Sequence, residues 1–334
     1  MKSVYYITLL IVILVILIFS LNAFGAETRI IYASSTTAQS SDYPGHVKIA
    51  ELGSSAIGEV TVISLGGTEA ATQALYNNES DVSGSTGPAL YESINGLGSW
   101  TGKKLPNITR VLHIMAMLDI PICVREGIGI NSISDLKGRE VFLGFPGTTT
   151  NGVYKLIFDA LGIEIKEYVG ELSDGVGAMK DKKIDVFIKS VNGNSLDATH
   201  MDIMTSTPIK FITFTDEEIE KIRGKYPWLT FRKFPAGYFS AFPDLGELWM
   251  YSTPKLTACR DNFPEEWAYS WVKNNVEKRE EILKVWKSAG LVDLLETPRI
   301  VGQIPGLFLH PGAIRYYKER GIEIPESVIP PEMK

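Results

Sequence analysis

The chain has 334 residues, of which 45% are hydrophobic and 22% are charged. This composition excludes a disordered chain, a collagen-like fibre and a small disulfide-stapled protein, because the apolar content is high and only two cysteines occur. A formal charge of −6 argues against nucleic-acid binding, which needs a basic face to displace counterions. The length suits two domains with their own cores.

The first 26 residues predict either a cleaved signal peptide or a retained membrane anchor. No charged residue lies between Lys2 and Glu27, and residues 4–21 read VYYITLLIVILVILIFSL. Small residues around Gly25 and Ala26 suit signal-peptidase cleavage, whereas the apolar run approaches the ~20 residues that span a bilayer. Both interpretations place the chain from about Glu27 onward in the periplasm or another extracytoplasmic space.

Short apolar strands alternate with helices from Arg29 onward. This alternation occurs in two successive segments of the chain, here called passes. In the first pass we expect strands at residues 29–33, 60–65 and 81–84, with helices at 44–52 and 69–76. In the second pass we expect strands at 140–144, 167–169 and 185–188, with helices at 152–161 and 176–180. This alternation predicts βαβ units and a largely parallel sheet. Two such passes predict a two-lobed α/β fold with a ligand cleft between the lobes.

The C-terminal third is predicted to be more helical. One amphipathic helix is expected over residues 263–283, with Trp267, Trp271 and Val272 on the face that packs against a lobe. The proline-containing tail, residues 321–334, is expected to lie extended over the surface.

The two cysteines leave two possibilities open. Cys123 and Cys259 could pair in an oxidising compartment, or both could be buried free thiols. Two cysteines alone make a zinc site improbable.

Catalytic motifs are absent from the sequence. The four histidines, His46, His113, His200 and His310, form no H-E-x-x-H pair, and neither a G-x-S-x-G elbow nor a phosphate-binding glycine loop occurs. We therefore predict no catalytic residue, no metal site and no cofactor. An enzyme that uses His310 or Lys189 as acid or base is the alternative.

Four loops rich in Ser, Thr and Gly follow predicted strands and precede predicted helices. Glycine lets the backbone approach a ligand, and hydroxyl groups beside free N–H groups at a helix start favour a small anion. Each loop alone is also explained by helix N-capping, but four of them across both lobes favour a shared binding cleft. Lys189, directly after the strand at 185–188, is either a cationic partner for that anion or an exposed lysine. The loops are residues 34–37, 66–68, 85–87 and 147–150.

Five segments distributed over most of the chain match a known family in order and spacing. They are residues 67–70, 127–138 (GIGINSISDLKG), 144–150 (GFPGTTT), 183–186 (KIDV) and 310–325 (HPGAIRYYKERGIEIP). In these segments the chain resembles the TAXI-type solute-binding proteins of tripartite ATP-independent periplasmic (TRAP) transporters. The resemblance implies a periplasmic-binding-protein-like fold with hinge crossovers. It also implies capture of a small organic acid or amino acid and its delivery to the TRAP membrane permease, without catalysis.

The resemblance transfers the family's binding positions to Tyr43, to Gly67 and Thr68, to Ser85 and Thr86, and to Thr148 and Thr150. Two departures affect the pocket floor: Thr149 stands where the family's turn has its second glycine, and loop 34–37 is rich in Ser and Thr where a glycine-rich turn is usual. A particular ligand such as glutamate is therefore not transferred. The full set of predicted ligand-binding residues is Ser34, Ser35, Tyr43, Gly67, Thr68, Ser85, Thr86, Gly147, Thr148, Thr149, Thr150 and Lys189.

The expected organisation follows from these predictions. Residues 27–118 together with 248–334 form the first lobe, and residues 119–247 form the second. The expected partners are a small anionic or zwitterionic ligand and the TRAP permease subunits, with no nucleic acid, and the protein is expected to be a monomer. If residues 4–21 stay uncleaved, a membrane-tethered sensory module is a further alternative.

Overall fold

The computed structural model describes residues 29–38, 40, 42–191 and 193–334. The predicted leader, residues 1–26, lies outside the described residues. Within them, no helix has the length and apolar character needed to cross a bilayer.

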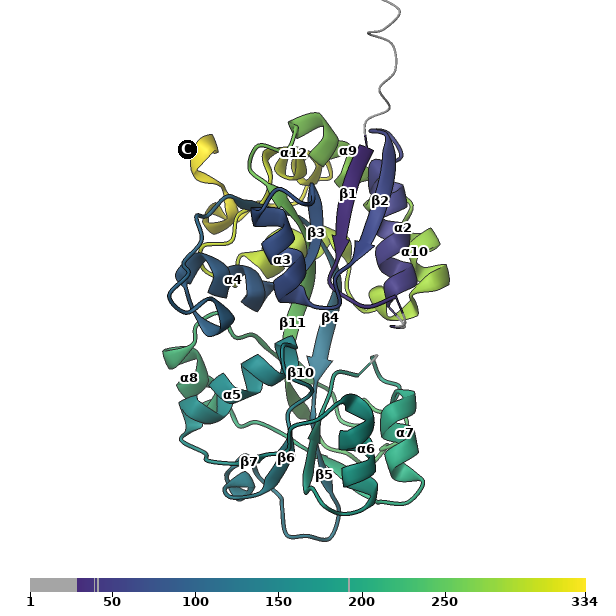
Figure 1. The fold of residues 1–334 in the computed structure, drawn as a ribbon, viewed down its shortest axis with the longest axis vertical. Coiled ribbons are helices and arrows are strands. Elements are labelled where there is room, and N and C mark those ends of the chain that lie inside the picture. The colour runs from purple at the N-terminus through teal and green to yellow at the C-terminus, as the bar shows by residue number, and fades with distance from the viewer. Residues whose placement is uncertain (1–28, 39, 41, 192) are drawn as a thin grey trace, which may run out of the picture.

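The first sheet has six strands: β1, β2 and β3 lie in the upper lobe of Figure 1, β4 and β11 run from it toward the lower lobe, and β10 lies near their lower ends. The main path of this sheet runs β10-β11-β3-β1-β2, and β4 pairs with β11. The β1–β2 and β1–β3 pairs are parallel, whereas β11 runs antiparallel to β3, β4 and β10. The strands are β1 (Arg29–Ser34), β2 (Glu59–Ser64), β3 (Val82–Thr86), β4 (Thr109–Ile120), β10 (Phe231–Phe234) and β11 (Leu248–Arg260).

The second sheet has five strands in the order β7-β6-β8-β5-β9 and forms the centre of the lower lobe. Its β6 is parallel to β7 and β8, whereas β5 is antiparallel to β8 and β9. The strands are β5 (Ile122–Arg125), β6 (Glu140–Phe142), β7 (Lys166–Glu167), β8 (Val186–Ile188) and β9 (Ile209–Ile212). Both sheets are thus mixed, which corrects the expected largely parallel sheet, because the long strands that return between the lobes pair antiparallel.

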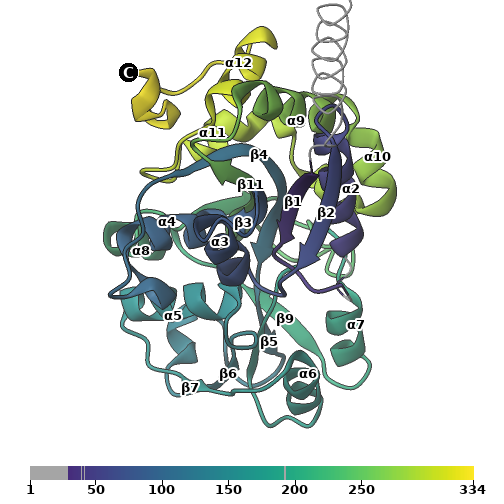
Figure 2. The same ribbon diagram turned by 45° about the horizontal axis from the view of Figure 1, so that its top comes forward.

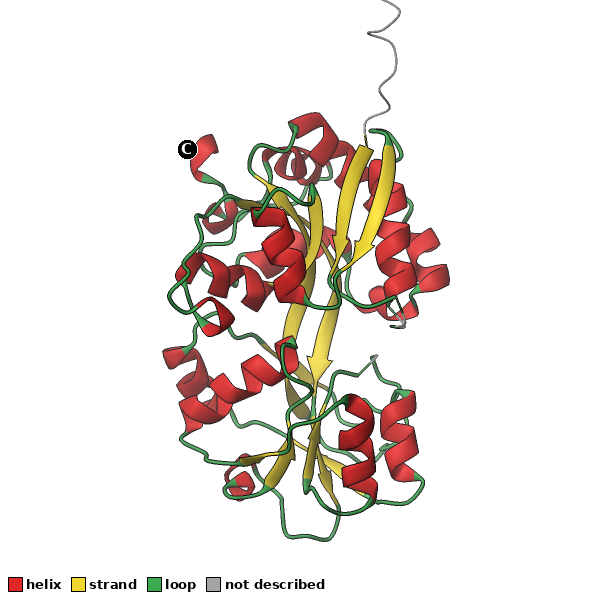
Figure 3. Ribbon diagram, viewed as in Figure 1, coloured by secondary structure: helices red, strands yellow, loops and turns green. Residues whose placement is uncertain are grey.

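Helices surround both sheets (Figure 3). The first lobe carries α2 (Tyr43–Ser54), α3 (Thr68–Tyr76), α4 (Gly87–Asn95), α9 (Glu265–Glu277), α10 (Arg279–Val285), α11 (Thr297–Val301) and α12 (Pro311–Glu319). The second lobe carries α5 (Thr149–Leu161), α6 (Leu172–Lys180), α7 (Ala198–Met204) and α8 (Asp216–Lys225). Single 3₁₀ turns cover Gly98–Trp100, Ile133–Leu136, Lys287–Leu291, Leu294–Glu296, Glu326–Val328 and Pro331–Met333.

Two long strands connect the lobes. β4 continues through Pro121 into β5, and β11 runs antiparallel beside β4 from Tyr251–Ile120 to Arg260–Thr109. At this crossing the buried Asp119 accepts a hydrogen bond from the Ser252 hydroxyl at 2.6 Å. The alternating α/β architecture on two sheets confirms the predicted fold class, a mixed α/β two-lobed fold with strand crossovers.

Two predicted features of the C-terminal third were wrong in detail. The helix expected over 263–283 is divided into α9 and α10 at Lys278, whose backbone (φ −107, ψ 24) leaves the helical region. The tail is not simply extended, because it forms two 3₁₀ turns. Its Val328 is buried, and Glu332 forms two hydrogen bonds of 2.7 Å with Arg110.

The two cysteines are separate buried thiols. Cys123 lies in β5 of the second sheet and Cys259 in β11 of the first, and both are free. Burial raises the pKa of the Cys123 thiol, so it remains protonated at neutral pH.

Candidate ligand-binding site

A cavity of about 610 Å³, here called the larger cavity, lies between the lobes beside β4. The first lobe contributes the loop between β1 and α2, and the second contributes the segment from the end of β8 into α7. A cavity of this size accepts a small organic solute. Its lining residues are Thr37, Ser40, Asp42, Ala116, Met117, Leu118, Leu172, Lys189, Ser190, Val191, Asp197, Ala198, Thr199, Trp286 and Ser288.

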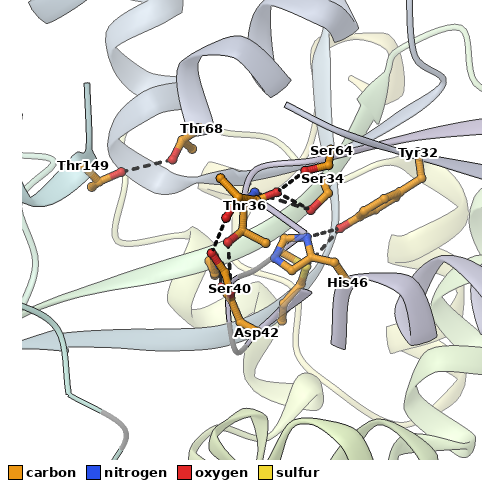
Figure 4. Close-up of polar contacts among 12 residues, drawn as sticks. Tyr32, Ser34, Thr36, Ser40, Asp42, His46, Ser64, Thr68 and Thr149 are labelled. Atoms are coloured by element: carbon orange, nitrogen blue, oxygen red, sulfur yellow. Dashed lines mark hydrogen bonds and ion pairs between the residues drawn. The ribbon is translucent and has the colours of Figure 1, made fainter. Parts of the chain in front are cut away.

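Asp42 provides the first lobe's charge in the larger cavity. It precedes α2 and accepts a hydrogen bond from the Thr36 hydroxyl at 2.9 Å, as Figure 4 shows. Its other carboxylate oxygen pairs with Lys255, a buried lysine of β11 that also lies 5.6 Å from the Trp286 ring centre. Burial acts to raise the pKa of Asp42, but the Lys255 ammonium outweighs it and lowers that pKa. Asp42 is therefore ionised at neutral pH.

The neighbouring His46 is uncharged. Its Nδ1 lies 3.1 Å from the hydroxyl of Tyr32, and the imidazole is fully buried (Figure 4). Burial, together with the charge of Lys255, lowers the pKa of His46 to about 3. The first lobe therefore presents Asp42 to the cleft, with its charge balanced from behind by the buried Lys255.

Lys189 and Asp197 provide the second lobe's charges. Lys189 follows β8, and its ammonium pairs with Asp197, which also accepts a hydrogen bond from the His200 ring at 2.9 Å and caps α7. Burial acts to raise the pKa of Asp197, but His200 and Lys189 hold it well below its usual range. Lys189 thus lines the larger cavity, and 24% of its side chain is exposed to solvent.

Three predicted threonines meet at the contact between the lobes. The Thr149 hydroxyl oxygen, at the start of α5, lies 3.3 Å from that of Thr68 and 3.5 Å from that of Thr86. A second cavity of about 70 Å³, here called the smaller cavity, adjoins this contact. Thr68, Gly147, Thr148 and Thr149 line it together with residues of α3, α4 and α5. The first and second lobes therefore touch through hydroxyl groups on this side.

The turn before α5 depends on glycine. Gly144 and Gly147 have φ of +86° and +82°, a region that L side chains rarely adopt. Thr148 then caps the helix by accepting a hydrogen bond from the Asn151 N–H at 3.3 Å. Thr150 lies in the first turn of α5, and its Cβ would be 3.4 Å from a Cβ placed on Gly144.

The other predicted residues lie at the same strand ends but outside the lining of either cavity. Ser34 and Ser35 are buried, and Ser34 donates to the Thr36 carbonyl at 3.4 Å (Figure 4). Ser85 is fully buried and bonded to Thr72 at 2.8 Å, behind α3. Tyr43 and Gly67 start α2 and cap α3, respectively.

The sequence interpretation missed Asp42, Lys255 and Asp197. Asp42 and Lys255 are 213 residues apart, so no local spacing connects them. Asp197 could have been found from the sequence. It precedes a short helix, where Asp is a common N-cap, and it lies only eight residues after Lys189.

Of the two residues named for the acid–base alternative, Lys189 lines the larger cavity, whereas His310 lies outside both cavities in the described part of the chain. No group of three or more His, Cys, Asp or Glu residues there could hold a metal ion. His310 caps α12: its Nδ1 accepts from the Gly312 N–H at 3.1 Å, and its Nε2–H donates to the Phe263 carbonyl at 2.8 Å. Both ring nitrogens of His310 are thus engaged in structural hydrogen bonds.

The fold and cleft define a two-lobed α/β protein with a polar site between its lobes. The chain belongs to the NMT1-like family, whose family model matches residues 33–321.

Several solved structures are similar to this chain. A TRAP periplasmic solute-binding protein from Ochrobactrum anthropi is 13% identical with a TM-score of 0.46, over 91% of this chain and 84% of that one. The periplasmic aliphatic sulphonate-binding protein SsuA from Escherichia coli is 11% identical with a TM-score of 0.42, over 91% and 96%. MatC from Rhodopseudomonas palustris, solved with bound malate, is 9% identical with a TM-score of 0.48, over 79% and 89%.

Proposed function

We propose that this protein is an extracytoplasmic solute-binding protein of the TAXI type. It captures a small organic acid or amino acid in the larger cavity and delivers it to a TRAP membrane permease, without catalysis. The observation that best supports this function is the lining of the larger cavity, which combines charged and hydroxyl groups from both lobes. A solute that contacts both lobes stabilises their closed arrangement over the open one.

Lys189 is the proposed partner of a solute carboxylate. An ammonium group has three N–H donors; Asp197 accepts one and the Ser190 carbonyl a second at 3.5 Å, which leaves the third for a solute. The hydroxyls of Ser40 and Ser190 lie in the same lining and can orient the rest of the solute. Among the other predicted binding residues, Thr68, Gly147, Thr148 and Thr149 line the smaller cavity, and Thr86 contacts Thr149; these keep their proposed role at the lobe contact.

The proposed lobe boundaries follow the strand crossovers. Residues 27–118 with 248–334 form the first lobe, and residues 119–247 form the second. The β4–β5 connection and the start of β11 act as hinges. Strand β10 lies within the second range but pairs with β11, so it belongs to the hinge region.

A thermal-shift screen tests the proposed function. Amino acids, dicarboxylates and aromatic acids are added to the full chain, because a solute that binds only the native state raises its melting temperature. Lys189→Met is expected to weaken the affinity for the best solute more than tenfold, since a hydrogen bond to a charged group contributes about 1.5–3 kcal/mol. Lys183→Met is the matched control, because Lys183 also pairs with an aspartate but is 66% exposed on the surface.

Two results would contradict the proposal: no solute class raises the melting temperature, or Lys189→Met binds as tightly as the Lys183→Met control. Conversion of the bound solute during incubation would contradict the absence of catalysis. N-terminal sequencing of the exported protein tests the leader, and a start at Met1 would exclude cleavage.

A further inference from the structure

We propose that protonation of Glu92 favours the closed arrangement of the two lobes, so that acidification closes the protein even without a solute. The proposal concerns the ligand-free chain and goes beyond the proposed function. Glu92 lies on α4, which packs against α5 of the second lobe, and Figures 1 and 2 both show α4 beside α5 and α8.

The environment of Glu92 disfavours a charge. Its side chain lines the smaller cavity with Glu69 of α3, while Val153 and Leu156 of α5 form the facing apolar wall. On the first lobe, the turn at Gly98 closes over the carboxylate so tightly that a Cβ there would lie 2.6 Å from Glu92 Oε2. Separation of the lobes removes the part of the cavity wall that α5 provides, whereas Glu69 and the Gly98 turn stay beside Glu92.

A second interlobe contact covers the same helix. The ring of Tyr91, next to Glu92, stacks on Trp228 with centroids 4.3 Å apart. Trp228 follows α8 in the second lobe, and its indole N–H is close enough to the Glu92 carboxyl group to favour the ionised form, an effect that burial and the Glu69 charge outweigh. Closing the lobes therefore desolvates Glu92 through aromatic and aliphatic groups.

The charged groups around Glu92 do not compensate its charge. From α3, Glu69 is a like charge, and its carboxylate accepts a hydrogen bond from the Ser99 hydroxyl at 2.5 Å. On α5, Lys155 pairs with Glu167 at 3.0 Å. On β11, burial raises the pKa of Tyr251, and the Glu92 charge raises it further.

The cations of α8 are engaged elsewhere. Lys221 donates to the Leu161 carbonyl at 3.3 Å, Arg223 lies over the Phe231 ring, and Lys225 pairs with Asp159 at 2.7 Å. No ion pair involves Glu92 or Glu69 among the residues that the structure describes.

Burial and the charge of Glu69 together raise the pKa of Glu92 to about 7 in this arrangement. As the lobes separate, water replaces the cover from the second lobe and the pKa of Glu92 falls toward that of a solvated glutamate, about 4.3, although Glu69 and the Gly98 turn stay beside it. The closed state thus binds a proton that the open state releases. The ratio of closed to open molecules is expected to fall by up to about tenfold per pH unit as pH rises between these values, and to level off above pH 7.

Distance measurements between the lobes test this proposal without a solute. Spin labels are attached to cysteines introduced at Glu51 of α2 and at the half-exposed Met201 of α7, because Cys123 and Cys259 are buried. The interlobe distance is then measured by electron–electron double resonance from pH 5 to pH 8. For the labelled wild type we expect a short distance at pH 5 and a growing population of longer distances toward pH 8.

Three variants test whether Glu92 causes the change of the interlobe distance with pH. Glu92→Gln, which mimics the protonated carboxyl, is expected to keep the short distance at every pH. Glu69→Gln removes the like charge and is expected to lower the midpoint pH of opening. Glu59→Gln, at the exposed start of β2, is the matched control and is expected to behave as wild type.

A distance that does not change with pH in the labelled wild type would overturn the proposal. So would an unchanged pH response in both Glu92→Gln and Glu69→Gln. Because no solute is present, either result leaves the proposed solute-binding function to its own test.

Discussion

The hydroxyl oxygen of Thr149 lies 3.3 Å from that of Thr68, and this contact joins the first turns of α5 and α3 across the two lobes. Thr149 stands at the position where the resembling family has a glycine in its turn. A glycine has no hydroxyl and cannot form this contact. The departure from the family pattern therefore coincides with a direct link between the lobes.

Thr149→Gly is expected to shift the ligand-free protein toward open lobes. A hydroxyl hydrogen bond contributes about 1 kcal/mol net, which corresponds to about a fivefold change in the closed-to-open ratio. Small-angle X-ray scattering checks this as an increase in the radius of gyration. Thr150→Gly is the matched control, because it places glycine in the same helical turn without removing the Thr149 hydroxyl. Equal radii for the two variants would show that the contact does not hold the lobes.

Substitutions of Asp42 and Lys255 are expected to have strongly non-additive effects on the free energy of unfolding. Breaking a buried pair leaves one charge uncompensated and costs about 3 kcal/mol. Asp42→Asn and Lys255→Met should each lower the free energy of unfolding by about this amount, measured by urea denaturation. The double variant should lose clearly less free energy of unfolding than the sum of the two single losses, because it leaves no unpaired buried charge. Additive losses would show that the two side chains act independently.

The same pair predicts an acid dependence. The folded-state pKa of Asp42 is lowered, so its contribution to stability is present above the unfolded pKa of about 3.9 and is lost as pH falls through the folded value. The stability difference between wild type and Asp42→Asn should therefore shrink below pH 4. Urea denaturation at pH 7, 4 and 3 measures it, and a constant difference would contradict the assignment.

Local pattern made six strands (β1, β2, β3, β6, β7 and β8), several helix starts and the hydroxyl loops predictable, whereas β4, β5, β9, β10 and β11 were not among the expected strands. Thr68, Thr86 and Thr149 follow strands or glycine turns, and the carboxyl ends of the parallel strands β1, β2 and β3 meet at one sheet edge. The charges of the site could not be predicted in the same way. Lys255 lies within a long, mostly apolar strand, and its partner Asp42 is close only because β11 returns through the first sheet. Which charged residues pair across a fold depends on the order in which the strands are arranged, and the local sequence pattern does not give that order.

His310→Ala is expected to destabilise the fold without changing solute affinity. The substitution removes the α12 cap and the hydrogen bond to Phe263, with an expected loss of about 2 kcal/mol. Burial lowers the pKa of His310 to about 4, so its contribution is complete above the unfolded pKa of about 6.5 and decreases as pH falls from there toward 4. Thermal melts at pH 7.5 and 5, with and without the best solute, check both statements. Loss of a chemical conversion of the solute in this variant would instead support the acid–base alternative.

Gly53→Ala is expected to lower stability although it replaces glycine within a helix. Alanine normally stabilises a helix interior by about 0.5–1 kcal/mol relative to glycine. At Gly53, however, the added Cβ would lie 2.2 Å from Cδ2 of Trp271, a fully buried indole through which α9 packs on α2. Overpacking of this kind costs about 1–3 kcal/mol, so the net effect is destabilising.

Gly177→Ala in α6 is the matched control for this substitution, because no atom lies within 4 Å of its added Cβ. It should raise the melting temperature while Gly53→Ala lowers it. If both substitutions raised the melting temperature, α2 and α9 would be able to separate around the new methyl group. The close approach of Gly53 to Trp271 would then not be needed for the first lobe to pack.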